Sequence, residues 1–397
     1  MRRTAGPDVA LVTYSTKPRG GVVHTLHLAE ALWRAGRSVH VVALGDPGTG
    51  FFRPTPVPHT IVPSPPPAPA LEDRVLEAVE ALGAGLGHVA DHFGILHAQD
   101  CVAARAATTV RDAGAAITVV RTVHHVDDFT TPALVDCQRR AIVEPDQVLV
   151  VSEHWRELLA REYGVEAGVV TNGIGLDRLR PPAQPSPAAL REEVGATNRF
   201  VFLTVGGIEP RKGSLTLIDA LGRVTSALDP APAVVVLGGT SFQDYSSYRE
   251  RALARADDLG LRRAGDLVVR GPVTEEELAA WYHAADAFVF PSEKEGFGLA
   301  VLEAMAVGLP AIASDIPVFR EHLHDGEGVL LVPAGDPGAL GAAMVRIATS
   351  PLLRERLGRI GPVVARRFTW ERCARQHVAL YERLGRQGLV RQEATGS

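Results

Sequence analysis

Residues 287–315 read AFVFPSEKEGFGLAVLEAMAVGLPAIASD and contain one complete strand–helix–strand repeat. The apolar run at 287–291 has the length of a buried strand, and the glycines that follow it allow a tight turn. The segment 299–308 has the composition of a packed helix, and the run at 309–315 predicts the next strand. This order of elements is typical of a parallel α/β sheet.

The same alternation extends through the rest of the chain. A helix is predicted at 24–37, where Leu26, Ala29, Leu32 and Trp33 recur at helical spacing. Further strands are predicted at 8–15, 38–45, 94–100, 117–125, 147–153 and 167–174, and then at 199–207, 232–239, 266–273 and 328–334. The chain is therefore expected to form two Rossmann-like, doubly wound α/β sheets in tandem, with ligands beyond the carboxyl ends of the strands.

Proline-rich stretches mark the expected boundary and one long loop. With 397 residues, the chain exceeds what a single core usually supports. Prolines and polar residues interrupt the alternation at 178–199, so we predict domains at 1–180 and 181–370, followed by a terminal helix and short tail at 371–397. Residues 53–70 are also dense in proline, which removes amide donors, and an extended loop is expected there.

Composition excludes several classes of function. The formal net charge of −5 argues against a nucleic-acid-binding protein. No apolar run reaches the roughly 18 residues of a membrane span, and scattered basic residues give no support for peripheral membrane association. The N-terminus lacks the pattern of a secretory signal, and the three cysteines form no CxxC pair, so we predict a cytoplasmic protein with reduced thiols.

Two glutamates in the opening stretch are the first candidate site residues. Glu295 precedes the predicted helix, and Glu303 lies four residues after Leu299, on the same helical face. Carboxylates accept hydrogen bonds from hydroxyls, and free amides at a helix start bind anions. This combination fits a ligand with hydroxyls and phosphate, namely a nucleotide sugar. The alternative, that Glu303 only pairs on a helix surface, is disfavoured by its apolar flanks.

Cations and glycines follow two other strands. Arg211 and Lys212 come after the strand at 199–207, where two cations could neutralise an anionic ligand, although such a pair can also be a solvated surface. Gly20 and Gly21 lie between the first strand and the first helix, where amides could cradle a phosphate or glycine could serve the turn alone. No GxGxxG fingerprint follows the first strand, so an NAD-dependent oxidoreductase ranks low.

Two histidines end the strand at 117–125, and two aspartates lie shortly after it. His124 or His125 could orient a sugar or pass a proton near neutral pH, and the two rings would point to opposite sides of a continued strand. Asp127 and Asp128 follow directly, but adjacent carboxylates are commonly a solvated loop, so no metal site is predicted.

The joint order of these motifs resembles glycosyltransferase family 4. The opening stretch carries the E-x7-E signature, and GG, VHH, TNGIGLDRLRP, GGIEPRKGS, GPV and FTW occur in the family's order along nearly the whole chain. The resemblance implies a GT-B fold, with two Rossmann-like domains facing a central cleft and the helix of 371–397 crossing back to the N-terminal domain. It also implies a retaining, metal-independent hexosyltransferase that moves a sugar from a nucleoside diphosphate to a hydroxyl of a small-molecule or glycan acceptor, with no cofactor.

The resemblance also implies residue roles. His124, preferred over its neighbour, would lie near the reacting carbon, and Glu295 would contact the donor sugar, so both are the candidate catalytic residues. Glu303 would hold the ribose and Lys212 the diphosphate. The remaining donor-binding candidates are Gly20, Gly21, Arg211, Val273, Gly296, Phe297, Gly298 and Leu299.

One position departs from the family pattern. Gly207 stands where the family commonly has an arginine of the diphosphate clamp. We expect Arg211 to take over, and the alternative is weakened or changed donor binding. The rival function is therefore a nucleotide-sugar-binding protein without transferase activity.

Overall fold

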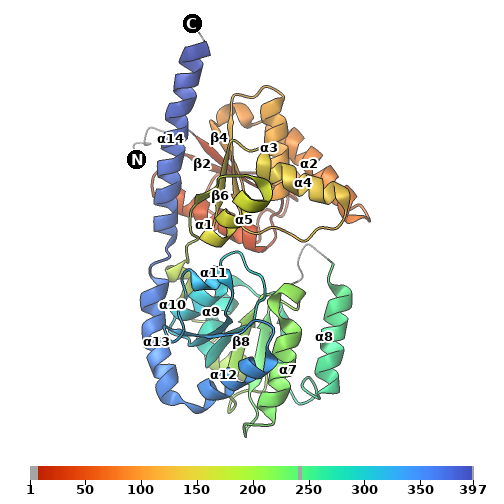
Figure 1. Cartoon of the computed structure of the whole chain (residues 1–397), viewed down its shortest axis with the longest axis vertical. Coiled ribbons are helices and arrows are strands. Elements are labelled where there is room, and N and C mark those ends of the chain that lie inside the picture. Colours follow the sequence, from red (N-terminus) through yellow and green to blue (C-terminus); the bar gives the residue numbers. More distant parts are fainter. Residues whose placement is uncertain (1–7, 240–243, 396–397) are drawn as a thin grey trace. The chain divides into compact units, whose positions relative to one another are not determined.

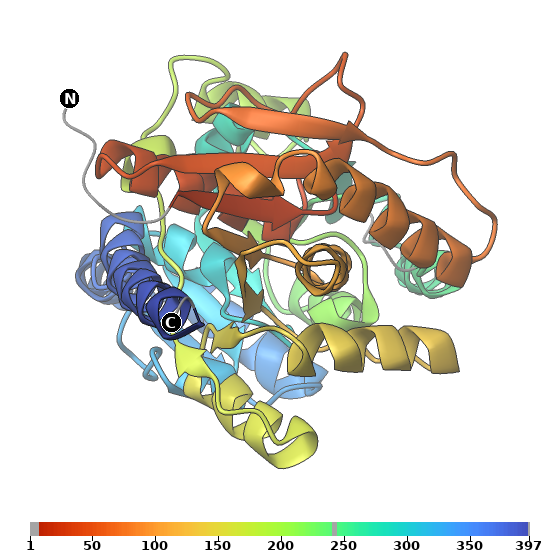
Figure 2. The same ribbon diagram turned by 90° about the horizontal axis from the view of Figure 1, so that it is seen from above.

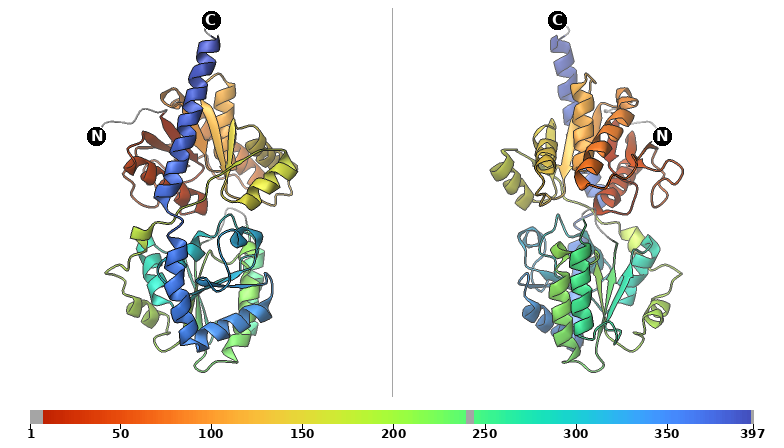
Figure 3. Two further views of the ribbon diagram at one scale, coloured as in Figure 1. Left: turned by 60° about the vertical axis from the view of Figure 1, so that its left-hand side comes forward. Right: turned by 90° about the vertical axis from the view of Figure 1, so that its right-hand side faces the viewer.

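The computed structural model describes residues 8–239 and 244–395 and divides into two compact units (Figure 1). Unit 1 comprises Met1–Gly173 and Trp370–Ser397, and unit 2 comprises Ile174–Thr369. Each unit contains one parallel sheet with helices on both sides (Figures 2 and 3). Within the described ranges, no helix combines the length and apolar character that a membrane span requires.

The sheet of unit 1 has seven strands in the order β3-β2-β1-β4-β5-β6-β7, and all neighbouring pairs are parallel. Its strands are β1 (Val9–Thr13), β2 (Val39–Gly45), β3 (His59–Pro63), β4 (Ile95–Ala98), β5 (Thr118–Val123), β6 (Gln147–Val150) and β7 (Gly168–Val169). Its helices are α1 (Gly20–Arg34), α2 (Leu71–Gly87), α3 (Cys101–Asp112), α4 (Pro132–Val143), α5 (Glu153–Tyr163) and α14 (Trp370–Thr395), with a 3-10 turn η1 (Ala90–His92).

The core of unit 1 follows from its uninterrupted apolar strands. Every residue of β1 is buried, as expected for a strand covered on both faces. On one face, Leu28 of α1 and Tyr381 of α14 pack against Leu11 of β1 in a single hydrophobic cluster. The C-terminal helix is therefore part of the core of unit 1, although it lies more than 200 residues after β7 in the sequence.

Two expectations for unit 1 need correction. Residues 53–70 were expected to be an extended loop, but His59–Pro63 form β3, which pairs in parallel with β2. Proline is tolerated because β3 is an edge strand, and an edge strand donates hydrogen bonds on one side only. The first helix begins at Gly20 instead of residue 24, so the two glycines form its first turn.

The sheet of unit 2 has six parallel strands in the order β10-β9-β8-β11-β12-β13, which is the Rossmann order 3-2-1-4-5-6. Its strands are β8 (Val201–Val205), β9 (Ala233–Leu237), β10 (Leu267–Gly271), β11 (Ala287–Phe290), β12 (Ala311–Ser314) and β13 (Val329–Val332). Its helices are α6 (Pro187–Glu193), α7 (Ser214–Thr225), α8 (Ser246–Asp258), α9 (Glu275–Ala284), α10 (Leu299–Ala306), α11 (Pro317–Arg320), α12 (Pro337–Thr349) and α13 (Pro351–Ala365), with 3-10 turns η2 (Leu176–Leu179) and η3 (Pro210–Lys212).

The proline-rich stretch at 178–199 belongs to unit 2, and the units change between Gly173 and Ile174. Its helix α6 buries Leu190 and packs against α9. Arg191 of α6 also forms an ion pair with Asp286, with an N–O distance of 2.7 Å. This stretch is therefore a folded part of the second unit.

Candidate active site

The candidate residues lie at the carboxyl ends of central strands in each unit. In unit 2, Arg211 and Lys212 follow β8, and Glu295 follows β11, the adjacent strand. The strand order reverses between β8 and β11, and ligands of open α/β sheets bind at such switch points. In unit 1, Gly20 follows β1 and His124 follows β5 at the corresponding edge.

Lys212 and Glu295 form a nearly buried ion pair. Lys212 Nζ donates to Glu295 Oε1 at 2.6 Å, and the side chains are only 13% and 9% exposed. The ammonium group also lies 4.5 Å from the ring centre of Phe290, at the end of β11. The two loops are joined by backbone as well, because the Glu293 amide donates to the Arg211 carbonyl at 2.8 Å.

The electrostatics of the pair keep the carboxylate ionised. Burial alone would raise the pKa of Glu295, but the positive charges of Lys212 and Arg211 outweigh it and hold this pKa below its usual value. Burial lowers the pKa of Lys212, and Glu295 opposes that shift. A carboxylate held in this way accepts hydrogen bonds from hydroxyls at neutral pH.

Arg211 lies beside the pair, while Gly207 has no room for a side chain. Arg211 donates to Glu209 at 3.1 Å and lies 3.5 Å from Glu295, with 39% of its side chain exposed. Gly207 has a φ of +72°, and a Cβ atom there would lie 2.3 Å from the carbonyl oxygen of Gly239. The loop after β8 therefore excludes the arginine that the family commonly has at this position.

The turn before α10 is shaped by aromatic packing. Gly298 precedes the helix with a φ of +88°, and a Cβ atom there would meet the ring of Phe319 at 2.3 Å. Phe297 stacks on His322, with ring centres 4.6 Å apart. The first helical hydrogen bond runs from Val301 to the Gly298 carbonyl, so the earlier amides, including that of Leu299, are free to bind an anion.

Glu303 lies on α10 and is only partly buried. It accepts a hydrogen bond from the Tyr282 hydroxyl at 2.9 Å. Burial raises the pKa of Glu303, the Tyr282 hydroxyl lowers it, and the charge of Glu275 raises it. A second carboxylate oxygen therefore remains for a ligand hydroxyl.

Val273 and Gly296 occupy loops at the same edge of the sheet. Val273 is half-buried between β10 and α9, and Gly296 is half-buried between β11 and α10. Because all strands of the sheet are parallel, these loops emerge on the side where Lys212 and Glu295 lie.

In unit 1, the loops after β1, β4 and β5 meet. A Cβ atom on Gly21 would lie 4.0 Å from the carbonyl oxygen of Gln99, which follows β4. His124 Nε2 lies 3.2 Å from Gln99 Oε1. The amides of Gly20 and Gly21 precede the first helical hydrogen bond of α1, which Val23 donates to Arg19.

The two neighbouring histidines have different surroundings. His124 is half-buried, and burial, followed by the charges of His24 and Arg121, holds its pKa well below the usual value. His125 is half exposed and faces Asp127, with its Nε2 atom 3.4 Å from the carboxylate. The structure thus brings His124, and not His125, to Gln99 at the strand ends.

The sequence analysis missed His24. It is buried on α1, and its ring centre lies 4.4 Å from that of His124 and 5.0 Å from that of Trp370. Its spacing from Leu28 and Leu32 places it on the buried face of the helix, and a histidine at such a position was the available signal.

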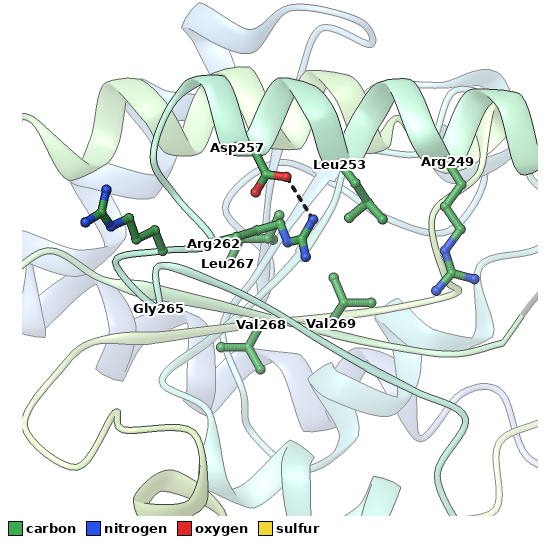
Figure 4. A pocket seen from close by; sticks show the side chains of 9 residues that line it. Arg249, Leu253, Asp257, Arg262, Gly265, Leu267, Val268 and Val269 are labelled. Carbon is green, nitrogen blue, oxygen red and sulfur yellow. Dashed lines mark hydrogen bonds and ion pairs between the residues drawn. The ribbon is translucent and has the colours of Figure 1, made fainter.

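A cavity in unit 2 lies away from these residues (Figure 4). It has a volume of about 660 Å³ and opens between α8 and β10. Its lining residues are Arg249, Leu253, Asp257, Arg262, Arg263, Gly265, Leu267, Val268 and Val269, none of which is a candidate site residue. In the part of the chain that the structure describes, no three histidine, cysteine, aspartate or glutamate side chains are grouped so that they could hold a metal ion.

Comparison with known proteins identifies the family of this chain. Residues 18–178 match the family model Glycosyltransferase Family 4, and residues 188–363 match Glycosyl transferases group 1. A phosphatidyl-myo-inositol mannosyltransferase of Mycobacterium leprae is 30% identical over 96% of this chain and 98% of its own length. This chain belongs to glycosyltransferase family 4.

Other relatives match a smaller part of this family 4 glycosyltransferase. A D-inositol 3-phosphate glycosyltransferase of Streptomyces bingchenggensis is 32% identical over 59% of the chain, which spans 52% of that protein. Among solved structures, sucrose-phosphate synthase from Thermosynechococcus elongatus has a TM-score of 0.77 at 23% identity, covering 95% of this chain and 99% of its own. HepE from Anabaena, solved with UDP and glucose, has a TM-score of 0.79 at 19% identity, with coverages of 94% and 99%. The predicted GT-B fold is confirmed.

Proposed function

We propose that this glycosyltransferase moves a hexose from a nucleoside diphosphate to an acceptor hydroxyl with retention of configuration and without a metal. The observation that carries the proposal is the Lys212–Glu295 pair at the switch point of unit 2, beside the free amides of α10. A cation, a hydroxyl acceptor and an anion-binding helix start are the groups that a sugar diphosphate requires.

The donor is assigned to unit 2. Lys212, with Arg211 beside it, neutralises the charge that grows on the departing diphosphate. Glu295 accepts hydrogen bonds from the donor sugar, while Glu303 uses its free oxygen for the ribose hydroxyls. The backbone from Gly296 to Leu299 contacts the sugar and phosphate, and Val273 offers its backbone to the base. HepE, a structural neighbour, was also solved with UDP-glucose, which supports a nucleotide sugar as the donor class.

The acceptor is assigned to unit 1, where His124 and the amides of Gly20 and Gly21 lie at the strand ends. Two relatives bear the names phosphatidyl-myo-inositol mannosyltransferase and D-inositol 3-phosphate glycosyltransferase. Both names refer to inositol, which is a cyclic polyol. We therefore place a cyclic polyol among the small-molecule and glycan acceptors to be tested first.

We assign retention of configuration to a same-face mechanism, in which the acceptor hydroxyl attacks the sugar on the face from which the diphosphate departs. Glu295 is held by Lys212, so it is not a free carboxylate nucleophile. The departing phosphate itself can accept the proton of the acceptor hydroxyl, and a neutral His124 orients the sugar by one hydrogen bond. The three cysteines, Cys101, Cys137 and Cys373, are free, which is consistent with the proposed cytoplasmic location.

The direct test is a donor and acceptor screen read by mass spectrometry. UDP-, GDP- and ADP-sugars are incubated with the protein and with inositol-type polyols or glycans, and the sugar product is analysed for its anomeric configuration. Glu295→Ala should abolish transfer while the protein stays folded, because the sugar loses its hydroxyl acceptor. Glu293→Ala, at an exposed position two residues earlier, is the matched control and should retain activity. Full activity of Glu295→Ala would refute the site assignment.

A second candidate is a family member that binds nucleotide sugars without transferring them. The observation that favours it is Gly207, where the commonly found arginine has no space. Calorimetry with the same donors separates the two candidates. Tight donor binding that is accompanied by neither transfer nor slow hydrolysis would favour the binding protein.

A further inference from the structure

His24 occupies an unusual place in unit 1. It lies on α1, is 2% exposed, and sits between two other rings. Its ring meets that of His124 edge-on, at 4.4 Å and an interplanar angle of 65°, and that of Trp370 at 5.0 Å and 72°. The His24 ring therefore contacts both Trp370, the first residue of α14, and His124, which follows β5.

The nitrogens of His24 are buried and poorly paired. Within the described residues neither Nδ1 nor Nε2 makes a hydrogen bond of good geometry, nor does Oδ1 of Asn172, but the Asn172 side chain lies close enough to raise the pKa of His24 as a hydrogen-bonding neighbour. His97, in the same core, is different: its ring nitrogens lie 2.6 Å from the Tyr381 hydroxyl and 2.7 Å from the Thr122 hydroxyl. A buried polar group with poor hydrogen bonding destabilises the fold, so phenylalanine would fill the place of His24 with less loss.

The His24 ring is also uncharged. Burial, followed by the charges of His377 and His27, lowers the pKa of His24 to about 3. A neutral imidazole carries one N–H donor and one acceptor, and the nearby Asn172 oxygen is a suitable partner for the donor. Edge-to-face ring contacts are favourable and depend on ring orientation, so the contact restricts the plane of His124.

We propose that His24 is a positioning residue for His124, which it holds in the reactive ring plane, and that its N–H pairs with Asn172 Oδ1 when substrate engages His124. The inference rests on the proposed role of His124 in transfer. The positioning role explains why an imidazole is present at position 24, where an apolar ring would stabilise the fold more. His124 then has two supports, Gln99 at its Nε2 atom and His24 at its face.

The test compares His24→Phe with His24→Gln. His24→Phe keeps a ring against His124 but removes the N–H that would fix the plane of that ring through Asn172, so kcat should fall about tenfold with a donor KM within about twofold, while Tm should rise or stay constant. His24→Gln, which retains an amide donor, should recover part of the lost kcat. His27→Phe is the matched control, because His27 lies on the same helix and also packs against Trp370, with ring centres 5.3 Å apart. Its kcat should be unchanged.

Asn172→Ala provides a second, independent arm. If His24 and Asn172 act as a pair, His24→Phe and Asn172→Ala should each lower kcat, and the double variant should lose no more than the more impaired single variant. Unchanged kcat in His24→Phe would overturn the proposal, as would a loss of kcat that is matched by a fall in Tm. Fully additive losses would overturn the pairing with Asn172.

A measurement without turnover separates this inference from the proposed function. In protein with ¹⁵N-labelled histidine, the His124 ring nitrogens should report one tautomer in the wild type and averaged signals in His24→Phe. If the wild type transfers no sugar from any donor, the proposed function fails, and this spectrum alone decides whether His24 positions His124. Identical His124 signals in both proteins would refute the positioning role.

Discussion

The candidate sites of the two units bury polar groups in opposite ways, although both lie at the carboxyl edge of a parallel sheet. In unit 2, Lys212 and Glu295 are both charged and lie 2.6 Å apart. In unit 1, burial holds the pKa values of His24, His97 and His124 below their usual value, so the rings are neutral. One site is stabilised by compensating charges, and the other avoids charge.

The difference follows from the chemistry of the side chains. A carboxylate can be buried when cations compensate its charge, and Lys212 with Arg211 does this for Glu295. An imidazole loses its proton easily and can then be buried without an ion partner. The proposed functions need this division, since a diphosphate calls for positive charge, whereas orienting a sugar calls for a neutral hydrogen-bonding ring.

The largest expected effect is that of breaking the charged pair. Lys212→Ala leaves the buried carboxylate compensated only by the partly exposed Arg211, which should cost up to about 3–5 kcal/mol, and removes a cation from the leaving diphosphate, which should lower transfer by about two to three orders of magnitude. Urea unfolding and turnover measure the two effects. The double variant Lys212→Met/Glu295→Gln should regain stability without activity, and a stable, active Lys212→Ala protein would remove the basis of the comparison.

Replacing His124, the neutral histidine at the strand ends of unit 1, should affect catalysis more than folding. His124→Phe should lower kcat by about two orders of magnitude, because the hydrogen bond to the sugar is lost, while the ring contact with His24 is kept. His125→Phe is the matched control, since that side chain is half exposed and faces Asp127. If His125→Phe were the impaired variant, the preference for His124 would be wrong.

Acid should destabilise unit 1 before unit 2. Five histidines of unit 1 have lowered pKa values, namely His24, His40, His97, His124 and His377, whereas in the described part of unit 2 only His322 has one. Burial lowers the pKa of both His377 and His322 from 6.5 to about 4. Between the folded-state pKa of about 4 and the ordinary pKa of 6.5, the unfolded chain binds more protons than the folded chain. The free energy of unfolding therefore falls as pH falls, by about 1.4 kcal/mol per pH unit for each histidine.

Hydrogen exchange measured by mass spectrometry between pH 7 and 5 can follow each unit separately. After correction for intrinsic exchange, peptides of β1 and α14 should lose protection at a higher pH than peptides of β11 and α10. Glu295 adds acid sensitivity to unit 2 only below its ordinary pKa of 4.5, because its folded-state pKa is lowered further. His24→Phe should reduce the difference between the units, and earlier loss in unit 2 would contradict the prediction.

Much of the fold could be predicted from apolar runs, because buried parallel strands such as β8 and β11 are almost continuously hydrophobic. The edge strand β3 was missed because its prolines indicate a loop unless the neighbouring strand is known. The start of α1 was missed because glycine is a poor helix former, although it is acceptable in a first turn.

The site was predictable where it depends on strand order. Lys212 and Glu295 follow two strands that a Rossmann topology makes neighbours, so their proximity follows from the fold. The contact of His24 with Trp370 depends on how α1 and α14 pack, and the sequence separates these residues by about 350 positions. The backbone conformation of Gly207 could not be predicted either, because no sequence pattern reveals that this residue lies against the Gly239 carbonyl.

Gly207 gives the smallest expected effect and tests how the charged site of unit 2 is built. Gly207→Arg would restore the common family residue, but its φ of +72° and the carbonyl of Gly239 oppose any side chain. We expect a loss of about 1–3 kcal/mol in the free energy of unfolding and no gain in donor affinity by calorimetry, because Arg211 already lies 3.5 Å from Glu295. Gly207→Ala, which carries the backbone strain without the charge, is the control. Tighter donor binding by Gly207→Arg alone would show that the diphosphate site lacks a cation, and that Arg211 does not supply it.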